Sequence, residues 1–392
     1  MGELREIRTL RPEDVGEQLA LDQFAFQFEL SPSDLEEARR NTNPDEVVAC
    51  YIDGRLAAKL ELLPMTTYIG GKRVAMGGIA GVATWPEYRR GGIVADLLRH
   101  SLRLMREQGL TLSHLTPFAF SFYRRYGWEH CIDRKQYTVE RSDWPVFDPT
   151  QGSIRRTDDY ALVAPVYEQF AMRYNGTLSR SEMWWKRRVA RSKPGIMAVY
   201  YDETDTPMGY VIYRVKSGDM TIHEFVHLSE DARRGLWNFI RNHDSMASKV
   251  TFVAPVDDIL PFLLGNPRIK QEILPYFMVR IVDVAAFLRQ YTFAKASQRA
   301  ELAVTVTDPN APWNERTFVV QPEANGPLVS VETEAAAVLN VSCDIQTLTA
   351  MLMGYRRPTE LSGIGRLLGS SEAVAAWETA VPYRTTFLYD FF

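Results

Sequence analysis

The sequence predicts an α+β fold divided into more than one unit. Asp53-Gly54 and Gly70-Gly71 each separate two apolar, strand-like stretches, as glycine-containing turns do in β-hairpins. Downstream of Gly92, apolar residues recur at helical spacing until Gly109. The chain has 392 residues, whereas single domains usually have about 100–200. We therefore expect hairpins and helices arranged in two or three domains.

The remaining elements follow in order along the chain. Residues 110–117 indicate a short strand, and residues 118–127 a short helix that ends at Gly127. The polar stretch 147–159 is interpreted as a linker. A second unit repeats the strand and the amphipathic helix of the first, and a small α+β unit of alternating strands and helices follows. The predicted domains are 1–150, 151–284 and 285–392.

Composition and charge exclude several classes of protein. The formal net charge of −4 does not favour a nucleic-acid-binding surface. The chain contains no apolar run long enough to span a membrane and begins with a charged stretch unlike a secretory signal. Three scattered cysteines do not indicate a disulfide framework. We therefore expect a cytoplasmic protein that binds neither nucleic acid nor membranes.

The segment "VATWPEYRRGGIVADLL" (82–98) carries the strongest chemical signal. A strand ends at Thr84, and a loop with two arginines and two glycines leads directly into a helix. Helix N-termini present unpaired N–H groups and partial positive charge, which suit phosphates. The segment lacks the features of a Walker loop and of a dinucleotide fingerprint. It predicts a pyrophosphate-binding loop, and the alternative is a basic loop that only caps the helix.

The segment "FAFSFYRRYGWEH" (118–130) lies downstream of that loop. Together the two segments resemble the GNAT superfamily of acetyl-CoA-dependent N-acetyltransferases. The whole chain resembles the Eis (enhanced intracellular survival) type, which has two GNAT domains followed by a small α+β domain similar to a sterol carrier protein. The resemblance implies an enzyme with acetyl-CoA as cosubstrate and a ring-like homo-oligomer such as a hexamer.

The resemblance also implies a cofactor site. The backbone at the end of the strand would bind the pantetheine arm and the thioester, the loop and helix start would hold the pyrophosphate, and two residues after the next strand would border the cofactor. The strand residues are Val82, Ala83 and Thr84. The loop and helix residues are Arg89, Arg90, Gly91, Gly92, Ile93, Val94 and Ala95. The two bordering residues are Phe118 and Ala119. Val94 departs from the small residue usual at the end of the loop motif.

Two groups would move protons. Tyr123 matches the family's acid, and a phenol with a pKa near 10 is protonated at neutral pH and can supply a proton to a leaving thiolate. Core packing is the alternative for Tyr123, and Tyr126 is its rival. In Eis-type proteins the C-terminal carboxylate is the base, and this chain likewise ends in an aromatic residue, Phe392. The alternative for the tail "TTFLYDFF" is that its aromatic residues only complete a core.

An amine acceptor gains from carboxylates and aromatic faces. Phe26 and Glu29, in an aromatic early helix, and Asp390 in the tail are candidate substrate residues, although solvated surface acids are an equal alternative for the two carboxylates. The acceptor would be a primary amine, either an aminoglycoside-like polyamine or a lysine side chain. A protein that binds an apolar ligand or coenzyme A, with a relic transferase site, is the alternative function.

Two other motifs are interpreted as having no metal-binding or cofactor-binding role. "HEFVH" (223–227) matches a zinc signature, but its surroundings predict a strand, in which the two histidines lie about 13 Å apart. No metal is therefore expected. In the second unit Leu236 takes the place of Gly92, and its side chain would obstruct a phosphate. We expect no cofactor site there.

Overall fold

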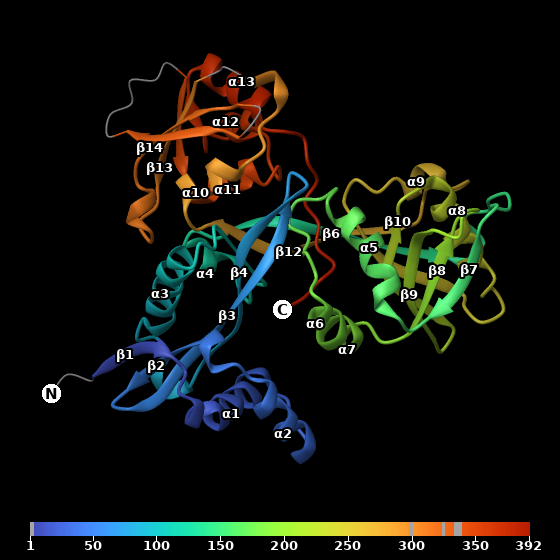
Figure 1. Ribbon diagram of the computed structural model, residues 1–392, viewed down its shortest axis with the longest axis horizontal. Helices are drawn as coiled ribbons and strands as arrows, with labels where there is room; N and C mark the ends of the chain where they lie inside the picture. The colour runs from blue at the N-terminus through green and yellow to red at the C-terminus, as the bar shows by residue number, and fades with distance from the viewer. Residues whose placement is uncertain (1–3, 298–300, 324–325, 333–338) are drawn as a thin grey trace.

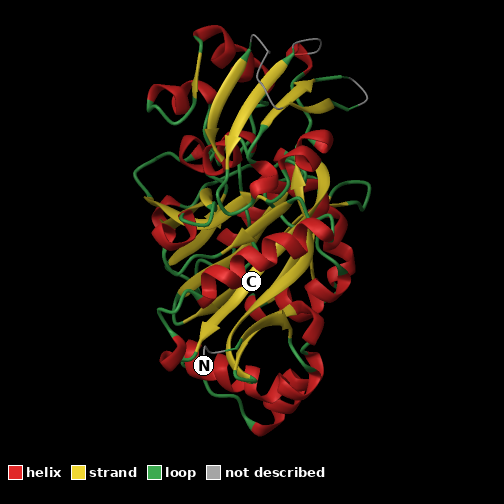
Figure 2. Ribbon diagram, turned by 90° about the vertical axis from the view of Figure 1, so that its left-hand side faces the viewer, coloured by secondary structure: helices red, strands yellow, loops and turns green. Residues whose placement is uncertain are grey.

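The computed structural model describes residues 4–297, 301–323, 326–332 and 339–392. Figure 1 shows three units: the first in blue and cyan, the second in green and yellow, and the third in orange and red. Figures 1 and 2 both place the C-terminus near the middle of the molecule rather than at its edge. The last residue thus lies where the units meet.

Each predicted unit contains both strands and helices, which agrees with the α+β fold class. The first unit comprises β1 (Arg5–Thr9), α1 (Val15–Phe26), α2 (Pro32–Asn41), β2 (Val47–Ile52), β3 (Arg55–Ile69), β4 (Lys72–Thr84), α3 (Ile93–Glu107), β5 (Leu112–Leu115), α4 (Phe120–Arg124) and β6 (Glu129–Glu140). The second comprises β7 (Ser153–Thr157), α5 (Tyr160–Ala171), α6 (Glu182–Trp184), α7 (Ala190–Ser192), β8 (Ile196–Tyr201), β9 (Pro207–Lys216), β10 (Asp219–His227), α8 (Glu230–Arg241), β11 (Lys249–Ala254), α9 (Leu260–Leu263) and β12 (Lys270–Ile281). The third comprises α10 (Val284–Gln290), β13 (Leu302–Thr307), β14 (Thr317–Gln321), β15 (Leu328–Glu332), β16 (Asn340–Asp344), α11 (Ile345–Leu352), α12 (Pro358–Gly363), β17 (Leu368–Gly369) and α13 (Ser371–Ala380).

The turn residues explain the hairpins. Asp53 and Gly54 both have positive φ, as do Gly70 and Gly71, which is the conformation that two-residue hairpin turns require. Gly109 and Gly127 also have positive φ, after α3 and α4 respectively. These turns and helix ends confirm the sequence prediction.

The first and second units share one sheet of twelve strands, in the order β1-β2-β3-β4-β5-β12-β6-β11-β10-β9-β8-β7. β12, the last strand of the second unit, inserts between β5 and β6 of the first. There Val279 pairs with both His114 of β5 and Glu129 of β6. The backbone of β6 also pairs with β11. Strands of the two units therefore alternate at the middle of the sheet. The predicted domain boundary at residue 150 divides the sequence, but it does not divide the sheet.

The two faces of β4 meet different elements. A side chain at Gly77 would collide with Met105 of α3, whereas one at Gly78 would collide with Met65 and with the ring of Phe392. Because successive residues of a strand point to opposite faces, α3 covers one face of β4 and the C-terminal residue covers the other. Glycine at both positions lets these neighbours approach the strand closely.

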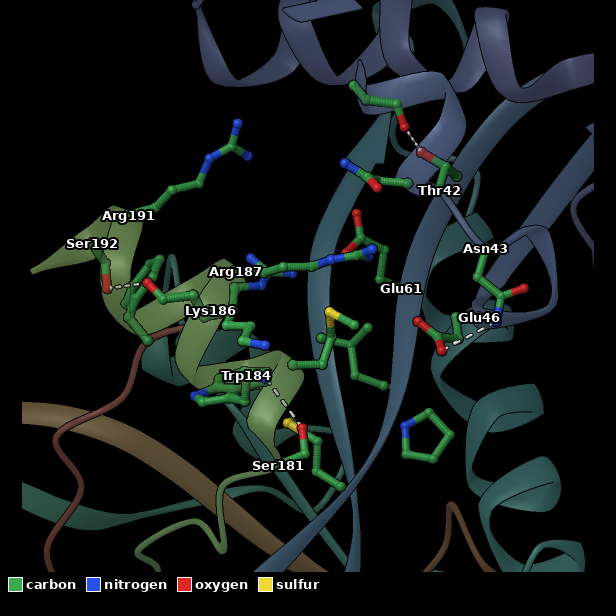
Figure 3. Close-up of a pocket in the computed structure, with 18 of the residues that line it drawn as sticks. Thr42, Asn43, Glu46, Glu61, Ser181, Trp184, Lys186, Arg187, Arg191 and Ser192 are labelled. Atoms are coloured by element: carbon green, nitrogen blue, oxygen red, sulfur yellow. Dashed lines mark hydrogen bonds between the residues drawn. The ribbon is translucent and has the colours of Figure 1, made fainter. Parts of the chain in front are cut away.

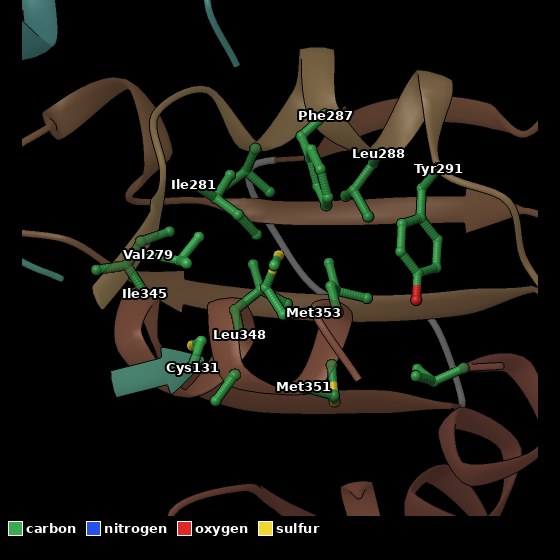
Figure 4. Close-up of a cluster of buried hydrophobic side chains, with 14 of the residues drawn as sticks. Cys131, Val279, Ile281, Phe287, Leu288, Tyr291, Ile345, Leu348, Met351 and Met353 are labelled. Carbon is green, nitrogen blue, oxygen red and sulfur yellow. The ribbon is translucent and has the colours of Figure 1, made fainter. Parts of the chain in front are cut away.

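The third unit adds a five-stranded sheet, in the order β15-β14-β13-β16-β17. Its core is continuous with the first unit, because Met76 of β4 and Leu112 of β5 belong to the same buried cluster as residues of α10 and α11. Figure 4 shows this cluster filled by side chains, among them Phe287, Leu348 and Met351. The third unit therefore anchors the sheet of the first.

Two details of the sequence prediction are wrong. The stretch 147–159 was interpreted as a linker, but it contains β7, whose Ser153–Thr157 pair with β8. The side chains of this edge strand are exposed or only partly buried, which explains its polar sequence. The early aromatic helix is also shorter than expected: α1 ends at Phe26, and Gln27 is left-handed with φ 56°. Glu29 therefore lies beyond the helix.

No helix in the described ranges combines the length and the apolarity needed to cross a membrane.

Stability is expected to fall as the solution becomes acidic. Burial lowers the pKa of His114 to about 3 and that of His227 to about 4. Burial acts to raise the pKa of Glu224, but Arg180 and Lys193 outweigh it and lower the pKa to about 2. The unfolded chain therefore binds protons that the folded chain does not. The pH range runs from 6.5 down to about 3 for His114, from 6.5 down to about 4 for His227, and from about 4.5 to 2 for Glu224. Each group then removes about 1.4 kcal/mol per pH unit within its range.

Thermal unfolding measured between pH 8 and 4 would check this expectation. The melting temperature should be nearly constant above pH 7 and fall below pH 6. His114→Gln, which removes one titrating group, should make the decline shallower. A melting temperature that stays constant down to pH 4 would contradict the prediction.

Candidate active site

β4 and β5 part at the centre of the sheet. They pair in parallel only from Met76↔Leu112 to Ile79↔Leu115. β5 ends there, while β4 continues to Thr84 past a bulge at Gly81, which has φ 53°. Within the described residues, Val82 to Thr84 have no ladder partner on the β5 side. An open strand edge of this kind can pair with an extended ligand, and the predicted pantetheine residues lie along it.

The predicted pyrophosphate loop follows at once. Gly92 precedes α3 with φ 78°, and no side chain caps the first N–H groups of the helix. A side chain at Gly92 would meet no atom within 4 Å, so the approach is open. Ile93, Val94 and Ala95 form the first turn. These features fit a diphosphate group, because unpaired N–H groups at a helix N-terminus attract anions.

The loop is held from two sides by arginines. Arg5 of β1 donates a hydrogen bond to the carbonyl of Gly91 at 2.9 Å and forms an ion pair with Asp96 of α3. Arg89 donates to the carbonyl of Thr84 at 3.2 Å. Arg90 is exposed, with φ 68°. The sequence did not indicate Arg5, because β1 lies far from the loop along the chain.

Tyr123 of α4 lies on the α3 side of the sheet. It is 2% exposed and packs with Ile79 and Leu115, the last residues before β4 and β5 part. Burial raises its pKa, so the phenol stays protonated at neutral pH. Phe118, 72% exposed, lies 5.3 Å from its ring, and Ala119 precedes α4. In the described chain no group is hydrogen-bonded to the Tyr123 hydroxyl.

Phe392 lies on the opposite face of β4. It is 7% exposed, packs on Gly78 and contacts the rings of Phe277 and Trp184 at centroid distances of 4.9 and 6.2 Å. Tyr123 and Phe392 thus lie on opposite faces of the sheet, beside the last paired residues of β4 and β5. The tail is extended, and Asn175 exchanges backbone hydrogen bonds with Thr385 and Phe387.

A buried ionic cluster fixes the tail. Arg180, at the centre, lies 3.0 Å from the carboxylate of Asp390 and also pairs with Glu224, which in turn pairs with Lys193. Trp184 Nε1 donates to Asp390 at 2.8 Å. The Asp390 carboxylate is therefore already bound by Arg180 and Trp184, and its predicted contact with the substrate is not favoured. Removing one partner of such a buried cluster leaves an uncompensated charge.

Glu224 belongs to the "HEFVH" segment. As expected, this segment is a strand, β10, so the zinc-type arrangement of His223 and His227 cannot form. Among the described residues no group of three or more His, Cys, Asp or Glu side chains could hold a metal ion. Glu224, the glutamate of the motif, instead forms an ion pair with Arg180, which also pairs with Asp390.

A cavity of about 1130 Å³ opens between the first and second units. Figure 3 shows it between the segment containing α6 and α7 on one side and β3 with the Thr42–Glu46 region on the other. Met65 and Phe391 also line it, next to Phe392. The cavity therefore reaches the tail at the face of β4 opposite α3.

Two predicted substrate residues do not line this cavity. Phe26 is 52% exposed and Glu29 is exposed beyond the end of α1. Carboxylates that the sequence analysis missed do line it, among them those of Asp22 and Glu61. Both pair with the fully buried Lys59, at 2.6 and 3.2 Å, beside the bulge at Gly81. The feature of the sequence that could have indicated these carboxylates is Lys59, a lysine within the apolar strand 56–63.

The second unit lacks an equivalent loop. α8 begins at Glu230, and Ser229 caps it by accepting a hydrogen bond from the backbone N–H of Ala232. Arg233, Arg234 and Gly235 therefore lie within the helix, not in a loop before it. Gly235 packs against Tyr200. This arrangement favours the interpretation of the second unit as silent.

Three family descriptions match successive parts of the chain. Residues 6–131 and 176–281 each match an acetyltransferase (GNAT) domain, and residues 284–389 match a sterol carrier protein domain. An uncharacterized N-acetyltransferase of Streptomyces griseus is 24% identical over 97% of both chains. The N-acetyltransferase Eis of Mycobacterium bovis is also 24% identical, over 87% of this chain and 85% of its own.

Solved structures agree along the full chain. A probable N-acyltransferase from Enterococcus faecalis has a TM-score of 0.90 and 28% identity, covering 99% of this chain and all of its own. Eis1 from Mycobacterium abscessus has the same fold, with a TM-score of 0.82 at 21% identity over 99% of this chain and all of its own. The chain is therefore a GNAT-family N-acetyltransferase of the Eis type, with two GNAT domains followed by a sterol-carrier-protein-like domain.

Proposed function

We propose that the protein transfers the acetyl group of acetyl-CoA directly to a primary amine, with no covalent enzyme intermediate. The observation that carries the proposal is the opening between β4 and β5. On one side lie the uncapped start of α3 and Tyr123, and on the other lie the large cavity and Phe392. A cosubstrate and an acceptor can thus meet across one strand.

Acetyl-CoA would supply an activated acetyl group as its thioester. The backbone of Val82 to Thr84 would pair with its extended arm, and an N–H group there would polarise the thioester carbonyl. The loop from Arg89 to Gly92 and the first turn of α3 would hold the diphosphate. Phe118, exposed beside Tyr123, would border the arm.

Two groups of the chain would move protons. The Phe392 carboxylate would accept a proton from the acceptor ammonium, directly or through a water, since only the neutral amine is nucleophilic. The Tyr123 hydroxyl would protonate the departing sulfur. The buried cluster around Arg180 would hold the tail so that its terminal carboxylate stays at the opening.

A thiol-release assay tests this function. Acetyl-CoA alone should release free thiol slowly, and addition of a primary amine should increase the rate and yield the N-acetyl product by mass spectrometry. Polyamines and lysine derivatives are the first acceptors to try. Binding of acetyl-CoA without turnover of any amine would refute the transferase and favour the alternative of a relic site.

Two glycines at the ends of α3 provide a test of the pyrophosphate loop. Gly92 and Gly109 have similar φ, 78° and 72°, and open space at the position of a side chain. Valine at either site strains the backbone to a similar degree. Gly92→Val should raise the KM for acetyl-CoA about tenfold or more, because charge-assisted hydrogen bonds to phosphate would be lost. Gly109→Val should leave the KM unchanged, and equal effects would exclude a specific role for the loop.

The predicted homo-oligomer and the cytoplasmic location are part of this proposal and rest on the resemblance and on composition. Sedimentation of the purified chain tests the first.

A further inference from the structure

One wall of the large cavity is basic. The helical segment 182–192 contributes Lys186, Arg187, Arg188 and Arg191 to the lining. A π-helical turn covers Trp185–Val189 in the middle of this segment, and such turns are frequent at functional sites. Figure 3 shows Arg187 extending into the cavity in the direction of Glu61. The sequence of this segment, "WWKRRVARSK", carried no assigned role.

The opposite walls are acidic, but their carboxylates are already engaged. Asp22 and Glu61 share the buried Lys59. Glu37 faces Arg191 at 3.3 Å, and Glu46 accepts a hydrogen bond from Asn43. A polycationic ligand would have to compete with these partners, which reduces what it gains from the acidic side.

Two cations of the basic wall have no such partner. Among the ion pairs found in the described part of the chain, none includes Arg187 or Arg188. Arg188 lies over the ring of Trp184, with its guanidinium carbon 5.7 Å from the ring centroid. The charge that the cavity offers to an incoming ligand at this wall is therefore positive. Arginine in a pocket suits a carboxylate or a phosphate, which it can bind through two parallel hydrogen bonds.

The basic wall and the site of transfer are different parts of the same cavity. Met65 lines the cavity and also faces Gly78, where Phe392 packs. Glu61 lines it beside the bulge at Gly81 of β4. An acceptor with its amine at β4 would therefore direct its remaining groups toward Arg187 and Arg188. Trp184 and Met183 lie in the same lining and suit an apolar linker.

We propose that the acceptor carries an anionic group, a carboxylate or a phosphate, at a distance from its primary amine, and that Arg187 binds this group. This inference rests on the proposed transferase function and narrows its acceptor class. The expected acceptor is then an amine that also carries a negative charge, rather than a purely cationic polyamine.

A matched pair of lysine derivatives tests the inference. Nα-acetyl-lysine and Nα-acetyl-lysine amide carry the same ε-amine and differ only in one carboxylate. The kcat/KM of the carboxylate form should exceed that of the amide about tenfold, mainly through KM, as for one charge-assisted hydrogen-bonded contact. Arg187→Gln should remove most of this preference without changing the amide's kcat/KM. Arg214→Gln, on an exposed residue of β9 outside the cavity lining, should preserve it.

The outcomes separate this inference from the function on which it rests. Equal turnover of the two derivatives, or better turnover of spermidine than of the carboxylate form, would overturn the inference while supporting the transferase. If no amine raised thiol release above the rate with acetyl-CoA alone, the transferase itself would be overturned. In that case, calorimetric titration of both derivatives without acetyl-CoA tests the inference separately from turnover. Equal affinities for the two derivatives would overturn it. Tighter binding of the carboxylate form that is lost in Arg187→Gln would support it.

Discussion

One glycine added after Phe392 is expected to lower kcat about 100-fold. The addition converts the terminal carboxylate into a neutral peptide group and moves the charge beyond the packed ring. Losing a positioned general base typically costs 10²–10⁴-fold. The tail itself should stay in place, because Asn175 binds Thr385 and Phe387, and Arg134 donates to the carbonyls of Leu388 and Tyr389 at 3.0 and 2.8 Å. Steady-state thiol release at saturating acetyl-CoA is the measurement.

Three controls isolate the charge of the terminus from the packing of the ring. The same glycine added before Met1 should leave kcat unchanged. Phe392→Leu keeps the carboxylate and loses aromatic packing, so its kcat should fall less than that of the extended chain. A semisynthetic chain with an amidated C-terminus keeps every side chain and should lose as much activity as the extended one. Full activity of the amide would refute the assignment of the base and leave Phe392 as a core residue only.

Tyr123→Phe is expected to lower kcat by about 100-fold or more, the usual range for loss of a general acid. The change removes only the hydroxyl, and the ring can still pack between Ile79 and Leu115. Acetyl-CoA should therefore bind as before, since the proposed diphosphate and pantetheine contacts lie elsewhere. Calorimetry for the affinity and single-turnover thiol release for the chemical step would together show this separation.

Tyr126→Phe is the matched control. Tyr126 lies one residue beyond Arg125, the residue that caps α4, is partly buried, and packs 5.2 Å from Phe122, with Arg99 5.9 Å from its ring. Its hydroxyl should not matter for transfer, so turnover should stay near that of the unchanged protein. Near-normal turnover of Tyr123→Phe together with a loss in Tyr126→Phe would show that the acid had been assigned to the wrong tyrosine.

Local patterns accounted for the elements of the first unit. Turn glycines at 54 and 71 need positive φ, and the apolar spacing of 93–105 needs one buried face, so the sequence predicted hairpins and α3 correctly. The proposed pyrophosphate loop was equally visible, because its chemistry depends on adjacent residues. The linker prediction failed at β7 because the side chains of this edge strand are exposed or only partly buried, so its sequence carries little apolar signal.

The residues of the proposed acceptor cavity could not be predicted from the sequence in this way. Asp22, Glu61 and Arg187 come from α1, β3 and the second unit, and only packing brings them to one cavity. For the same reason Asp390 seemed available to a substrate, whereas Arg180, 210 residues away in the sequence, engages it.

The sequence by itself determined the strand-loop-helix motif, the family and the existence of an aromatic C-terminal tail, because these depend on neighbouring residues and local periodicity. Only the tertiary structure decided that β12 crosses into the first sheet, that β4 and β5 part at Ile79, and that Phe392 lies across β4 from α3. These arrangements depend on contacts between segments that are distant along the chain, whose energies come from shared burial and charge pairing and leave no periodic trace in the sequence.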